Sequence, residues 1–322
     1  MKAVLFPGQG VEWRRWMQPH LSNKIVEKSL IEAEEVTEIP LRKYILDAKP
    51  DHGLPKLSTF IAQPAILACT IGLFRAFFQR KSKPVLFVGH SLGEYSALVA
   101  SQALPFQSAL KLVMVRARAM DEACRLTQDK TSMLALTLYN RSTCAIKFQE
   151  DVIKAKMPFP LIDIANVNSS RQIVLSGNYE QLETLSTSIQ SKSVNLGRVR
   201  TNWLDVAGAF HSHYMLPAME PLEEALQKTE FLTQETETSF ISPSNELRLP
   251  VVSNVTADLY PIEASKIRKL LLLQCVKPVL FWQSLSRLKS EHGITQCYPC
   301  GPGSTMQSLA KQNEMHVEEQ HY

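Results

Sequence analysis

The chain of 322 residues is long enough for one large domain with a smaller one inserted or appended, and it can bury a core without disulfide or metal staples. Apolar residues make up 45% and charged residues 20%, the balance of a soluble globular protein. The 35 basic and 31 acidic residues leave a net charge of +4. This mild excess is not the profile of a nucleic-acid binder, but it suits ligands that carry phosphates and carboxylates.

Six cysteines are scattered along the chain, mostly in apolar runs, which predicts reduced core residues of an intracellular protein. They are Cys69, Cys124, Cys144, Cys275, Cys297 and Cys300. Cys297 and Cys300 form a lone C-x-x-C without the second pair that a zinc site would want, so we expect no metal. We also expect no signal peptide before the first strand and no membrane span, on the ground that no uncharged run reaches the roughly 18 residues of a span.

The first third of the chain alternates strands, turns and helices. In order these are a strand at 3–6, the turn cluster Pro7-Gly8-Gln9-Gly10, a helix at 60–79, a strand at 85–88, and helices at 92–102 and 105–125. Continuous apolar runs of four residues are typical of strands buried on both faces of a parallel sheet. The alternation therefore predicts an α/β fold.

The pattern changes in the middle of the chain. In order we expect a strand at 133–139, a helix to about 156, strands at 161–165 and 172–177, a helix at 179–191 and an extended segment at 197–206. The order β-α-β-β-α-β is that of a ferredoxin-like module. We assign this module to residues 128–199, inserted in a larger domain of residues 1–127 and 200–322.

The remainder of the chain carries fewer signals. Helices are expected at 214–227 and 263–273, with a strand at 250–254 between them. The tail after Glu314 is charged and polar, so we expect it to fray. Basic residues among the first 30 could double as a weak organelle address, but an ordinary helix surface is the simpler interpretation.

Gly89-His90-Ser91-Leu92-Gly93 is a G-x-S-x-G pattern directly after a buried strand and before a helix. A sharp strand-to-helix turn exposes the serine hydroxyl at the carboxyl edge of a sheet. Side chains in place of the two glycines would collide with neighbouring backbone, and the N–H of Leu92 can point at a developing oxyanion. The pattern predicts that Ser91 is a nucleophile; the alternative is a glycine-flanked turn with a capping serine.

Such a serine needs a base, because its hydroxyl is a poor nucleophile at neutral pH. His90 adjoins Ser91, but neighbouring side chains on a strand or turn point apart. His211 and His213 follow the small residues Gly208 and Ala209, which permit close packing against another loop. Spacing alone does not choose between these two histidines.

An arginine interrupts the apolar stripe of the expected helix at 105–125. The stripe consists of Ala109, Leu112, Val113, Arg116, Ala119 and Met120. A buried arginine is unfavourable unless an anion meets it. Arg116 is therefore a candidate anion-binding residue; the alternative is a snorkelling surface arginine like Arg118.

Five segments carry most of the unusual glycine, proline and histidine patterns. They are Phe6-Pro7-Gly8-Gln9-Gly10, Gly89-His90-Ser91-Leu92-Gly93-Glu94, Gly208-Ala209-Phe210-His211-Ser212, Ser253-Asn254-Val255-Thr256 and Gly301-Pro302-Gly303. Together they resemble the signature set of malonyl-CoA:acyl-carrier-protein transacylases, shared by acyltransferase domains of polyketide and fatty acid synthases. The resemblance spans residues 3–310. It implies an α/β-hydrolase-like large domain with a parallel sheet and an inserted ferredoxin-like subdomain, in agreement with the expected elements.

The resemblance also implies roles for individual residues. Ser91 resembles the acylated nucleophile and His211 its general base. The backbone carbonyl of Gln274 stands at the position that orients this histidine, so the pair resembles a Ser–His dyad. Gln9 and Leu92 resemble the residues whose N–H groups form the oxyanion hole. The alternative for Gln9 is a plain turn residue.

Arg116, which follows Ser91 by 25 residues, resembles the malonyl-binding arginine of the family. Its planar fork suits the free carboxylate of a malonyl group bound at both oxygens. Gln63 is expected to line the same pocket. One segment departs from the family, which often has Ser-Gln after Gly-Gln-Gly where this chain has Val11-Glu12-Trp13. The departure changes the loop beside the oxyanion hole and leaves Gln9 in place.

The resemblance implies an S-malonyltransferase that moves malonyl from coenzyme A, through a malonyl-serine ester, to the phosphopantetheine thiol of an acyl carrier protein. The pathway would be fatty acid or polyketide synthesis, with ping-pong kinetics and no bound cofactor. We expect a monomer without nucleic-acid or membrane partners. Low glycine and high Ser, Lys and Gln content favour the mitochondrial matrix over the bacterial cytoplasm.

Three alternatives remain open. An acyl hydrolase that edits carrier proteins would use the same Ser–His pair, but it would not need a buried Arg116. A non-catalytic docking module for carrier proteins would not need Ser91 and His211. A lipid esterase is the third alternative.

Overall fold

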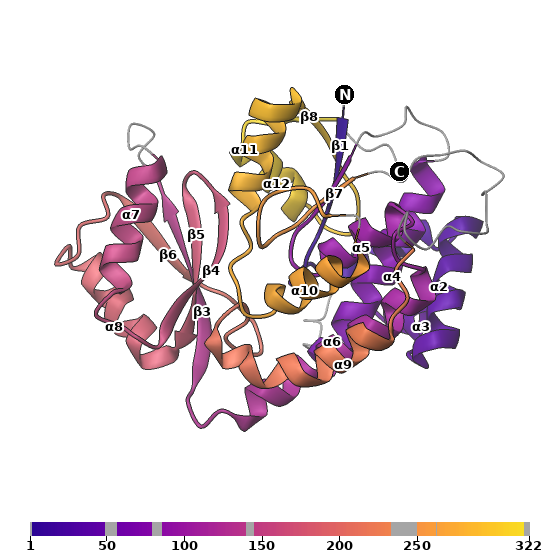
Figure 1. Ribbon diagram of the computed structural model, residues 1–322, viewed down its shortest axis with the longest axis horizontal. Helices are drawn as coiled ribbons and strands as arrows, with labels where there is room; N and C mark the ends of the chain where they lie inside the picture. The colour runs from indigo at the N-terminus through magenta and orange to yellow at the C-terminus, as the bar shows by residue number, and fades with distance from the viewer. Residues whose placement is uncertain are drawn as a thin grey trace.

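The computed structural model describes residues 2–48, 57–78, 86–139, 145–232, 250–261 and 263–318. Cys144 and Val85 lie outside these ranges. A parallel sheet and an antiparallel sheet define a larger and a smaller subdomain, which lie side by side (Figure 1). This is the two-part α/β architecture that the sequence predicts.

The larger subdomain is built on a parallel sheet of strand order β7-β2-β1-β8-β9. The strands are β1 (Lys2–Phe6), β2 (Leu86–Gly89), β7 (Val251–Val252), β8 (Gln296–Pro299) and β9 (His316–Val317). Val4 and Phe6 of β1 pack into one apolar core, and Ala3 and Leu5 pack into another. Because alternate residues of a strand face opposite sides of the sheet, both faces of β1 are covered.

Helices enclose this sheet from both sides. They are α1 (Trp13–Met17), the 3₁₀ turn η1 (Gln18–His20), α2 (Lys24–Thr37), α3 (Leu41–Leu46), α4 (Thr59–Phe78), α5 (Gly93–Ala100), α6 (Phe106–Leu126), the 3₁₀ turn η2 (His213–Ala218), α9 (Met219–Lys228), α10 (Ala264–Gln274), α11 (Phe281–His292) and α12 (Thr305–Gln312). Helices α2, α4 and α6 pack together on one side, and α11 and α12 cover the other (Figure 1).

Helix α4 is long and apolar enough to cross a membrane by length and composition alone. The expectation that no stretch reaches that length overlooked this segment, which runs uncharged from Leu57 to Phe74. Within the folded chain, 78% of its apolar window is buried. Burial against α2 and α6 identifies α4 as a core helix.

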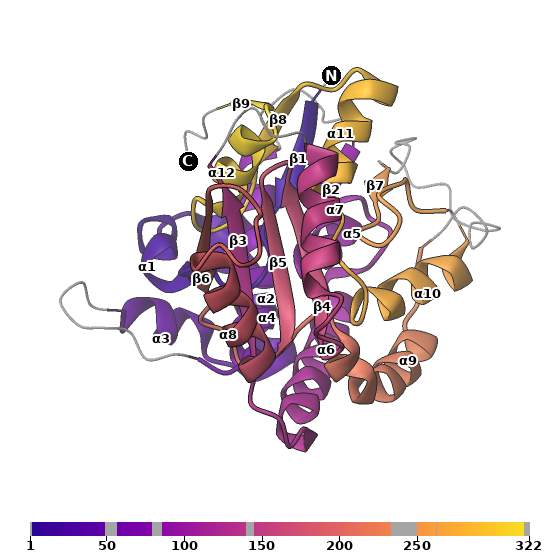
Figure 2. The same cartoon turned by 90° about the vertical axis from the view of Figure 1, so that its left-hand side faces the viewer.

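The smaller subdomain has an antiparallel sheet of order β4-β5-β3-β6. Its elements are β3 (Thr131–Leu138), α7 (Ala145–Lys156), β4 (Ile162–Ser169), β5 (Gln172–Asn178), α8 (Tyr179–Gln190) and β6 (Val199–Trp203). Helices α7 and α8 cover the outer face of this sheet (Figure 2). The element order is the β-α-β-β-α-β order predicted for a ferredoxin-like module. The division at residues 128–199 stays a prediction, and we propose a later boundary because β6 continues to Trp203.

Several elements differ from the sequence expectation. The helix expected from residue 214 begins as the 3₁₀ turn η2, which contains Pro217, and becomes α-helical only at Met219. The strand expected at 250–254 is two residues long. The tail does not fray at once after Glu314, because β9 pairs with β8. No bounds were predicted for helices α1, α2, α3, α11 and α12 or for strands β8 and β9.

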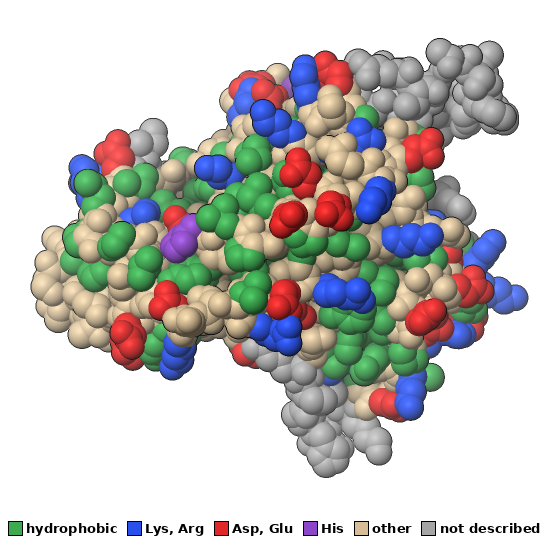
Figure 3. All heavy atoms as spheres, turned by 60° about the horizontal axis from the view of Figure 1, so that its bottom comes forward, with side chains coloured by type: hydrophobic (Ala, Val, Ile, Leu, Met, Phe, Trp, Pro, Cys, Tyr) green, Lys and Arg blue, Asp and Glu red, His purple; other side chains and the backbone are tan. Residues whose placement is uncertain are grey.

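The surface charges and the cysteines agree with what the composition predicts. Basic and acidic side chains are mixed on the face shown in Figure 3, as a small net charge predicts. The five cysteines in the described residues are all free, and Cys297 and Cys300 are buried. The described ranges contain no group of three or more His, Cys, Asp or Glu residues placed to hold a metal ion.

Candidate active site

Four of the five sequence motifs lie at the carboxyl ends of adjacent parallel strands. The loops after β1, β2, β7 and β8 carry Gly8-Gln9-Gly10, His90-Ser91-Leu92, Ser253-Asn254 and Gly301-Pro302-Gly303. A Cβ atom on Gly8 would lie 2.7 Å from the carbonyl oxygen of His90, and one on Gly301 would lie 2.6 Å from the ring of Pro7. Glycine at these positions therefore lets three loops converge.

The turn between β2 and α5 has the sharp geometry that the G-x-S-x-G pattern predicts. Ser91 has a left-handed backbone conformation with φ of 52°. A Cβ on Gly89 would lie 2.0 Å from the backbone of Gly93, and one on Gly93 would lie 2.3 Å from the carbonyl of Phe6. The predicted collisions are therefore confirmed, and only glycine fits on either side of this turn.

Asn254 holds this turn from the neighbouring strand end. Its Oδ1 accepts a hydrogen bond from the Ser91 N–H at 2.7 Å, and its Nδ2 donates to the Gly89 carbonyl at 2.7 Å. A left-handed serine is less stable than an extended one, so fixed contacts of this kind are needed to maintain it. Sequence reasoning quoted the Ser253-Asn254-Val255-Thr256 segment but assigned Asn254 no role.

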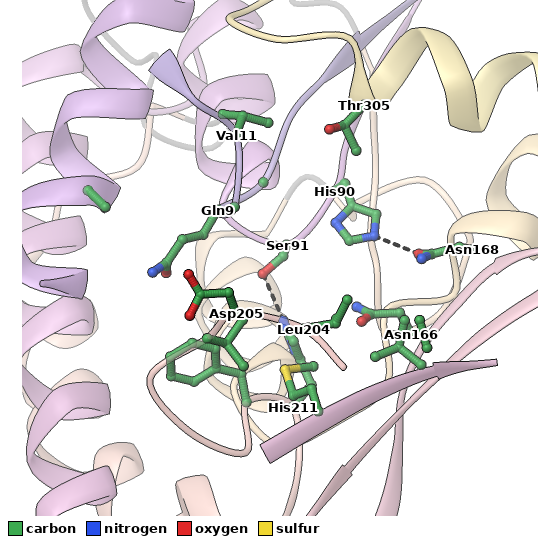
Figure 4. Close-up of a pocket in the computed structure, with 18 of the residues that line it drawn as sticks. Gln9, Val11, His90, Ser91, Asn166, Asn168, Leu204, Asp205, His211 and Thr305 are labelled. Atoms are coloured by element: carbon green, nitrogen blue, oxygen red, sulfur yellow. Dashed lines mark hydrogen bonds between the residues drawn. The ribbon is translucent and has the colours of Figure 1, made fainter. Parts of the chain in front are cut away.

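Ser91 and His211 are hydrogen-bonded, with 2.7 Å between Oγ and Nε2 (Figure 4). The other ring nitrogen, Nδ1, lies 2.8 Å from the backbone carbonyl of Gln274, as expected. Burial and the nearby charge of Arg116 lower the pKa of His211 to about 3, so the ring is neutral at neutral pH. A neutral ring that donates from Nδ1 to a carbonyl has its lone pair on Nε2, facing the serine hydroxyl.

The other two candidate histidines contact different partners. The ring of His213 bonds to Asp163 of β4, with 2.6 Å between Nδ1 and Oδ2. The ring of His90 points away from Ser91, and its Nε2 lies 2.8 Å from Oδ1 of Asn168 (Figure 4). The structure therefore makes the choice that spacing left open, because only His211 reaches the serine hydroxyl.

Arg116 is buried, with 1% of its surface exposed, so it does not snorkel. Nη1 donates to Oε1 of Gln63 at 2.7 Å, and Nη2 donates to Oε1 of Gln274 at 3.0 Å. Nη2 also lies 3.4 Å from the Ser91 hydroxyl, and Nε has no hydrogen-bond partner. A buried cation bonded to neutral oxygens, with one donor unused, is suited to an added anion.

The two expected oxyanion-hole donors come from two loops: Gln9 follows β1, and Leu92 follows Ser91 in the turn after β2. Within the described part of the chain, the backbone N–H groups of Gln9 and Leu92 have no hydrogen-bond partner. The Gln9 side chain accepts a bond from Nε2 of Gln63 at 3.3 Å. Gln63 is fully buried behind Arg116 and Gln9, so it supports the cavity wall rather than lining it.

A cavity of about 800 Å³ opens over these residues, between the two subdomains. The larger subdomain contributes Gln9, Ser91, Arg116 and His211, and the sheet of the smaller subdomain contributes residues of β3, β4, β5 and β6. The segment Val11-Glu12-Trp13, which differs from the family pattern, also lines this cavity. Glu12 accepts a hydrogen bond from the backbone N–H of Arg14 at 2.9 Å and forms an ion pair with the Arg14 side chain. The cavity is large enough for an extended acyl thioester.

A buried carboxyl group, Glu94, lies beneath the serine and was not assigned a role from the sequence. Its Oε1 accepts bonds from the Asn254 N–H at 2.9 Å and from the Tyr260 hydroxyl at 2.6 Å. Its Oε2 accepts a bond from the side-chain amide of Gln274. Burial raises the pKa of Glu94 to about 7, against the opposing effect of these donors. Glu94 is the final residue of the motif Gly89-His90-Ser91-Leu92-Gly93-Glu94, and its place in that motif was the sequence signal that could have indicated a role.

Proteins that are similar to this chain in sequence are acyltransferases. Residues 4–257 match the family model described as acyl transferase domain. The mitochondrial malonyl CoA-acyl carrier protein transacylase of Schizosaccharomyces pombe is 54% identical, over 97% of this chain and 98% of that protein. The malonyl CoA-acyl carrier protein transacylase of Bacillus subtilis strain 168 is 33% identical, over 96% and 89%.

Solved structures agree with the sequence relatives. The crystal structure of the enzyme MCAT from Streptococcus pneumoniae matches this chain with a TM-score of 0.79 and 29% identity, and the match covers 98% of this chain and 95% of that one. A type II polyketide acyl-carrier protein in complex with its malonyl-transacylase gives a TM-score of 0.80 at 26% identity, covering 98% and 94%. The chain belongs to the malonyl CoA-acyl carrier protein transacylase family of acyltransferases, as its motifs predicted.

Proposed function

We propose that this chain transfers a malonyl group from coenzyme A to the phosphopantetheine thiol of an acyl carrier protein. One observation carries the choice of acyl group: a buried guanidinium, that of Arg116, lies 3.4 Å from the Ser91 hydroxyl and keeps a free Nε donor. A malonyl group attached to Ser91 would extend its carboxylate toward this cation. The names of the related enzymes support the same substrate and carrier.

The first half-reaction forms a malonyl ester on Ser91. Nε2 of His211 removes the hydroxyl proton while Oγ attacks the thioester carbonyl carbon. The N–H groups of Gln9 and Leu92 stabilise the negative charge that develops on the carbonyl oxygen. The carbon–sulfur bond then breaks, His211 transfers its proton to the sulfur, and coenzyme A leaves as the free thiol.

The second half-reaction reverses these roles with a different thiol. His211 removes the proton of the phosphopantetheine thiol, whose sulfur attacks the ester carbonyl of malonyl-Ser91. The ester bond breaks, Ser91 recovers its proton from His211, and malonyl leaves on the carrier. Because one product departs before the second substrate binds, the kinetics are ping-pong. These steps need neither a metal nor a bound cofactor.

A carrier-editing hydrolase is the nearest alternative, and it would use the same serine and histidine. Such an enzyme gains nothing from burying Arg116, since its substrates carry no second carboxylate. The buried arginine therefore favours the transferase. Intact Ser91 and His211 in hydrogen-bond contact favour an enzyme over a docking module.

The names of related proteins support a cellular compartment and a pathway for this chain. The Schizosaccharomyces pombe and Drosophila melanogaster relatives are both named as mitochondrial, which supports the mitochondrial matrix and fatty acid synthesis for this chain. A single chain brings Ser91, His211 and Arg116 together, so we propose a monomeric enzyme that needs no second subunit to complete its site.

The test is incubation with labelled malonyl-CoA, with and without holo acyl carrier protein, followed by mass spectrometry of the peptide that contains Ser91. We expect a malonyl adduct on Ser91 without carrier and its transfer to the carrier thiol when carrier is added. Release of free malonate at the same rate with and without carrier would identify a hydrolase instead.

A further inference from the structure

We propose that Glu94 is a positioning residue for acyl-group selection: it fixes which end of the Gln274 side-chain amide faces Arg116. The inference rests on the role proposed above for Arg116. It assigns a purpose to a buried carboxyl group that the Ser91–His211 chemistry does not use.

Glu94 offers two hydrogen-bond acceptors in a place where every neighbour is a donor. It lies in the first turn of α5 and is fully buried. Oε1 accepts from the backbone N–H of Asn254 and from the hydroxyl of Tyr260, and Oε2 accepts from Nε2 of Gln274. The Asn254 N–H can only donate, so Oε1 must remain an acceptor.

The side-chain amide of Gln274 is held in one orientation by contacts at both ends. Its Nε2 donates to the Ser91 carbonyl at 2.9 Å and to Glu94, and both partners are acceptors. Its Oε1 accepts from Nη2 of Arg116 at 3.0 Å. A flipped amide would set its oxygen against two other oxygens and its NH₂ group against the guanidinium.

Only the ionised carboxylate, the form that Glu94 takes above its raised pKa of about 7, satisfies this arrangement from position 94. With an amide there, the oxygen would stay on the Asn254 N–H, and the new NH₂ group would face the NH₂ group of Gln274. If Gln274 flipped to relieve that clash, its own NH₂ group would face Arg116. The first state leaves the new NH₂ group without an acceptor, and the second sets the Gln274 NH₂ group against the guanidinium; both are strongly unfavourable.

Gln274 has two separate connections to the proposed site. Its backbone carbonyl contacts Nδ1 of His211 at 2.8 Å, and its side-chain oxygen contacts Arg116. Of these two parts of Gln274, Glu94 contacts only the side chain. A change at Glu94 therefore disturbs the guanidinium and leaves the acceptor for His211 in place, so malonyl transfer should suffer more than acetyl transfer.

The experiment compares, at pH 8 where Glu94 is ionised, the ratio of kcat/KM for malonyl-CoA to kcat/KM for acetyl-CoA in wild type, Glu94→Gln, Tyr260→Phe and Arg116→Ala. We expect Glu94→Gln to lower the ratio by about tenfold or more, through a rise in KM for malonyl-CoA and a smaller change in kcat for acetyl-CoA. The matched control Tyr260→Phe removes one bond to Oε1 but spares Oε2, so its ratio should stay within about twofold of wild type.

The outcomes separate this inference from the proposed function. If Arg116→Ala leaves the ratio unchanged, the role of Arg116 fails. If Arg116→Ala lowers the ratio but Glu94→Gln lowers both substrates equally, Glu94 is only structural and the inference is wrong. In the double variant Glu94→Gln/Arg116→Ala the ratio should be no lower than in Arg116→Ala, because both changes act through one group.

A second variant covers the case in which Glu94→Gln does not fold. Gln274→Met keeps the backbone carbonyl that His211 contacts but removes both polar ends of the side chain. We expect the same selective loss of malonyl transfer. A Gln274→Met enzyme with wild-type selectivity would overturn the inference, since the Gln274 side chain is the only proposed link between Glu94 and Arg116.

Discussion

Ser91 and His211 share a hydrogen bond of 2.7 Å although each has a left-handed backbone conformation, with φ of 52° and 56°. That conformation is unfavourable by roughly 1–2 kcal/mol for a residue with a side chain. Asn254 fixes the serine from the loop after β7, and the carbonyl of Gln274, the last residue of α10, fixes the histidine ring. Both reactive atoms are therefore held in place before substrate binds.

The first prediction concerns Ser91→Ala. The change removes the hydroxyl that attacks the thioester, so no acyl-enzyme should form from malonyl-CoA. Stability should change by less than about 1 kcal/mol, because the Asn254 contact uses the backbone of Ser91. Intact-protein mass spectrometry and thermal unfolding provide the two measurements. Covalent label on the variant would show that another residue is the nucleophile.

The second prediction separates two histidines. His211→Ala should lower the rate of acylation by about 10²–10⁴-fold, since it removes the base from a weak nucleophile. His213→Ala should lower it by less than about tenfold, because the His213 ring contacts Asp163 and not Ser91. Single-turnover acylation measures both rates. The reverse order would move the base to His213.

The third prediction uses the charge of Arg116. Removal of one member of a buried ion pair typically costs about 2–5 kcal/mol, which is roughly 30-fold to a few thousandfold in kcat/KM. Arg116→Ala should lose this much with malonyl-CoA and keep its activity with acetyl-CoA, which has no carboxylate. Arg116→Lys should restore only part of the activity with malonyl-CoA, because an ammonium group cannot bond to both carboxylate oxygens as a planar guanidinium does. Equal losses with both substrates would make Arg116 structural.

The fourth prediction concerns pH and Glu94. Its pKa is raised from 4.5 to about 7, so the folded state keeps a proton that the unfolded state has released. The stability from Glu94 is therefore complete below pH 4.5 and is lost as pH rises through 7, by up to about 3 kcal/mol.

Urea unfolding of wild type and Glu94→Gln at pH 5 and pH 8 measures this effect. Wild type should lose more stability than the variant between the two values. His211, whose pKa is lowered to about 3, acts in the opposite direction, but it is present in both proteins and cancels in the difference. An equal change in both proteins would contradict the raised pKa.

The fifth prediction compares two glycines. Gly93→Ala should destabilise the protein by at least about 2 kcal/mol, because the new Cβ would lie 2.3 Å from the Phe6 carbonyl. Gly72→Ala in α4 is the matched control: its nearest neighbour would be 3.4 Å away, and alanine favours a helix by about 1 kcal/mol. Denaturant unfolding compares them, and equal stabilities would contradict the packing argument.

Local patterns predicted much of the fold. Apolar runs and glycine turns indicated β1, β2, α4, α5, α6 and the whole smaller subdomain, because period and punctuation are written within a few residues. Strand β8 and the pairing of β9 with it escaped, since both are short and depend on partners far along the chain. Propensity carries little information about such short strands, whose pairing depends on context.

The sequence by itself determined the serine turn, because two glycines around Ser91 between a strand and a helix leave little geometric freedom. It also indicated an unusual Arg116, because one charge on an apolar stripe is visible from helical spacing. Residue spacing left His211 and His213 open and the family resemblance favoured His211, but only the tertiary structure showed which ring meets Ser91. It also showed that Glu94, Gln274 and Arg116 form one network. These contacts join residues 120, 158 and 180 positions apart, so their geometry is set by the packing of separate strands and helices and not by local spacing.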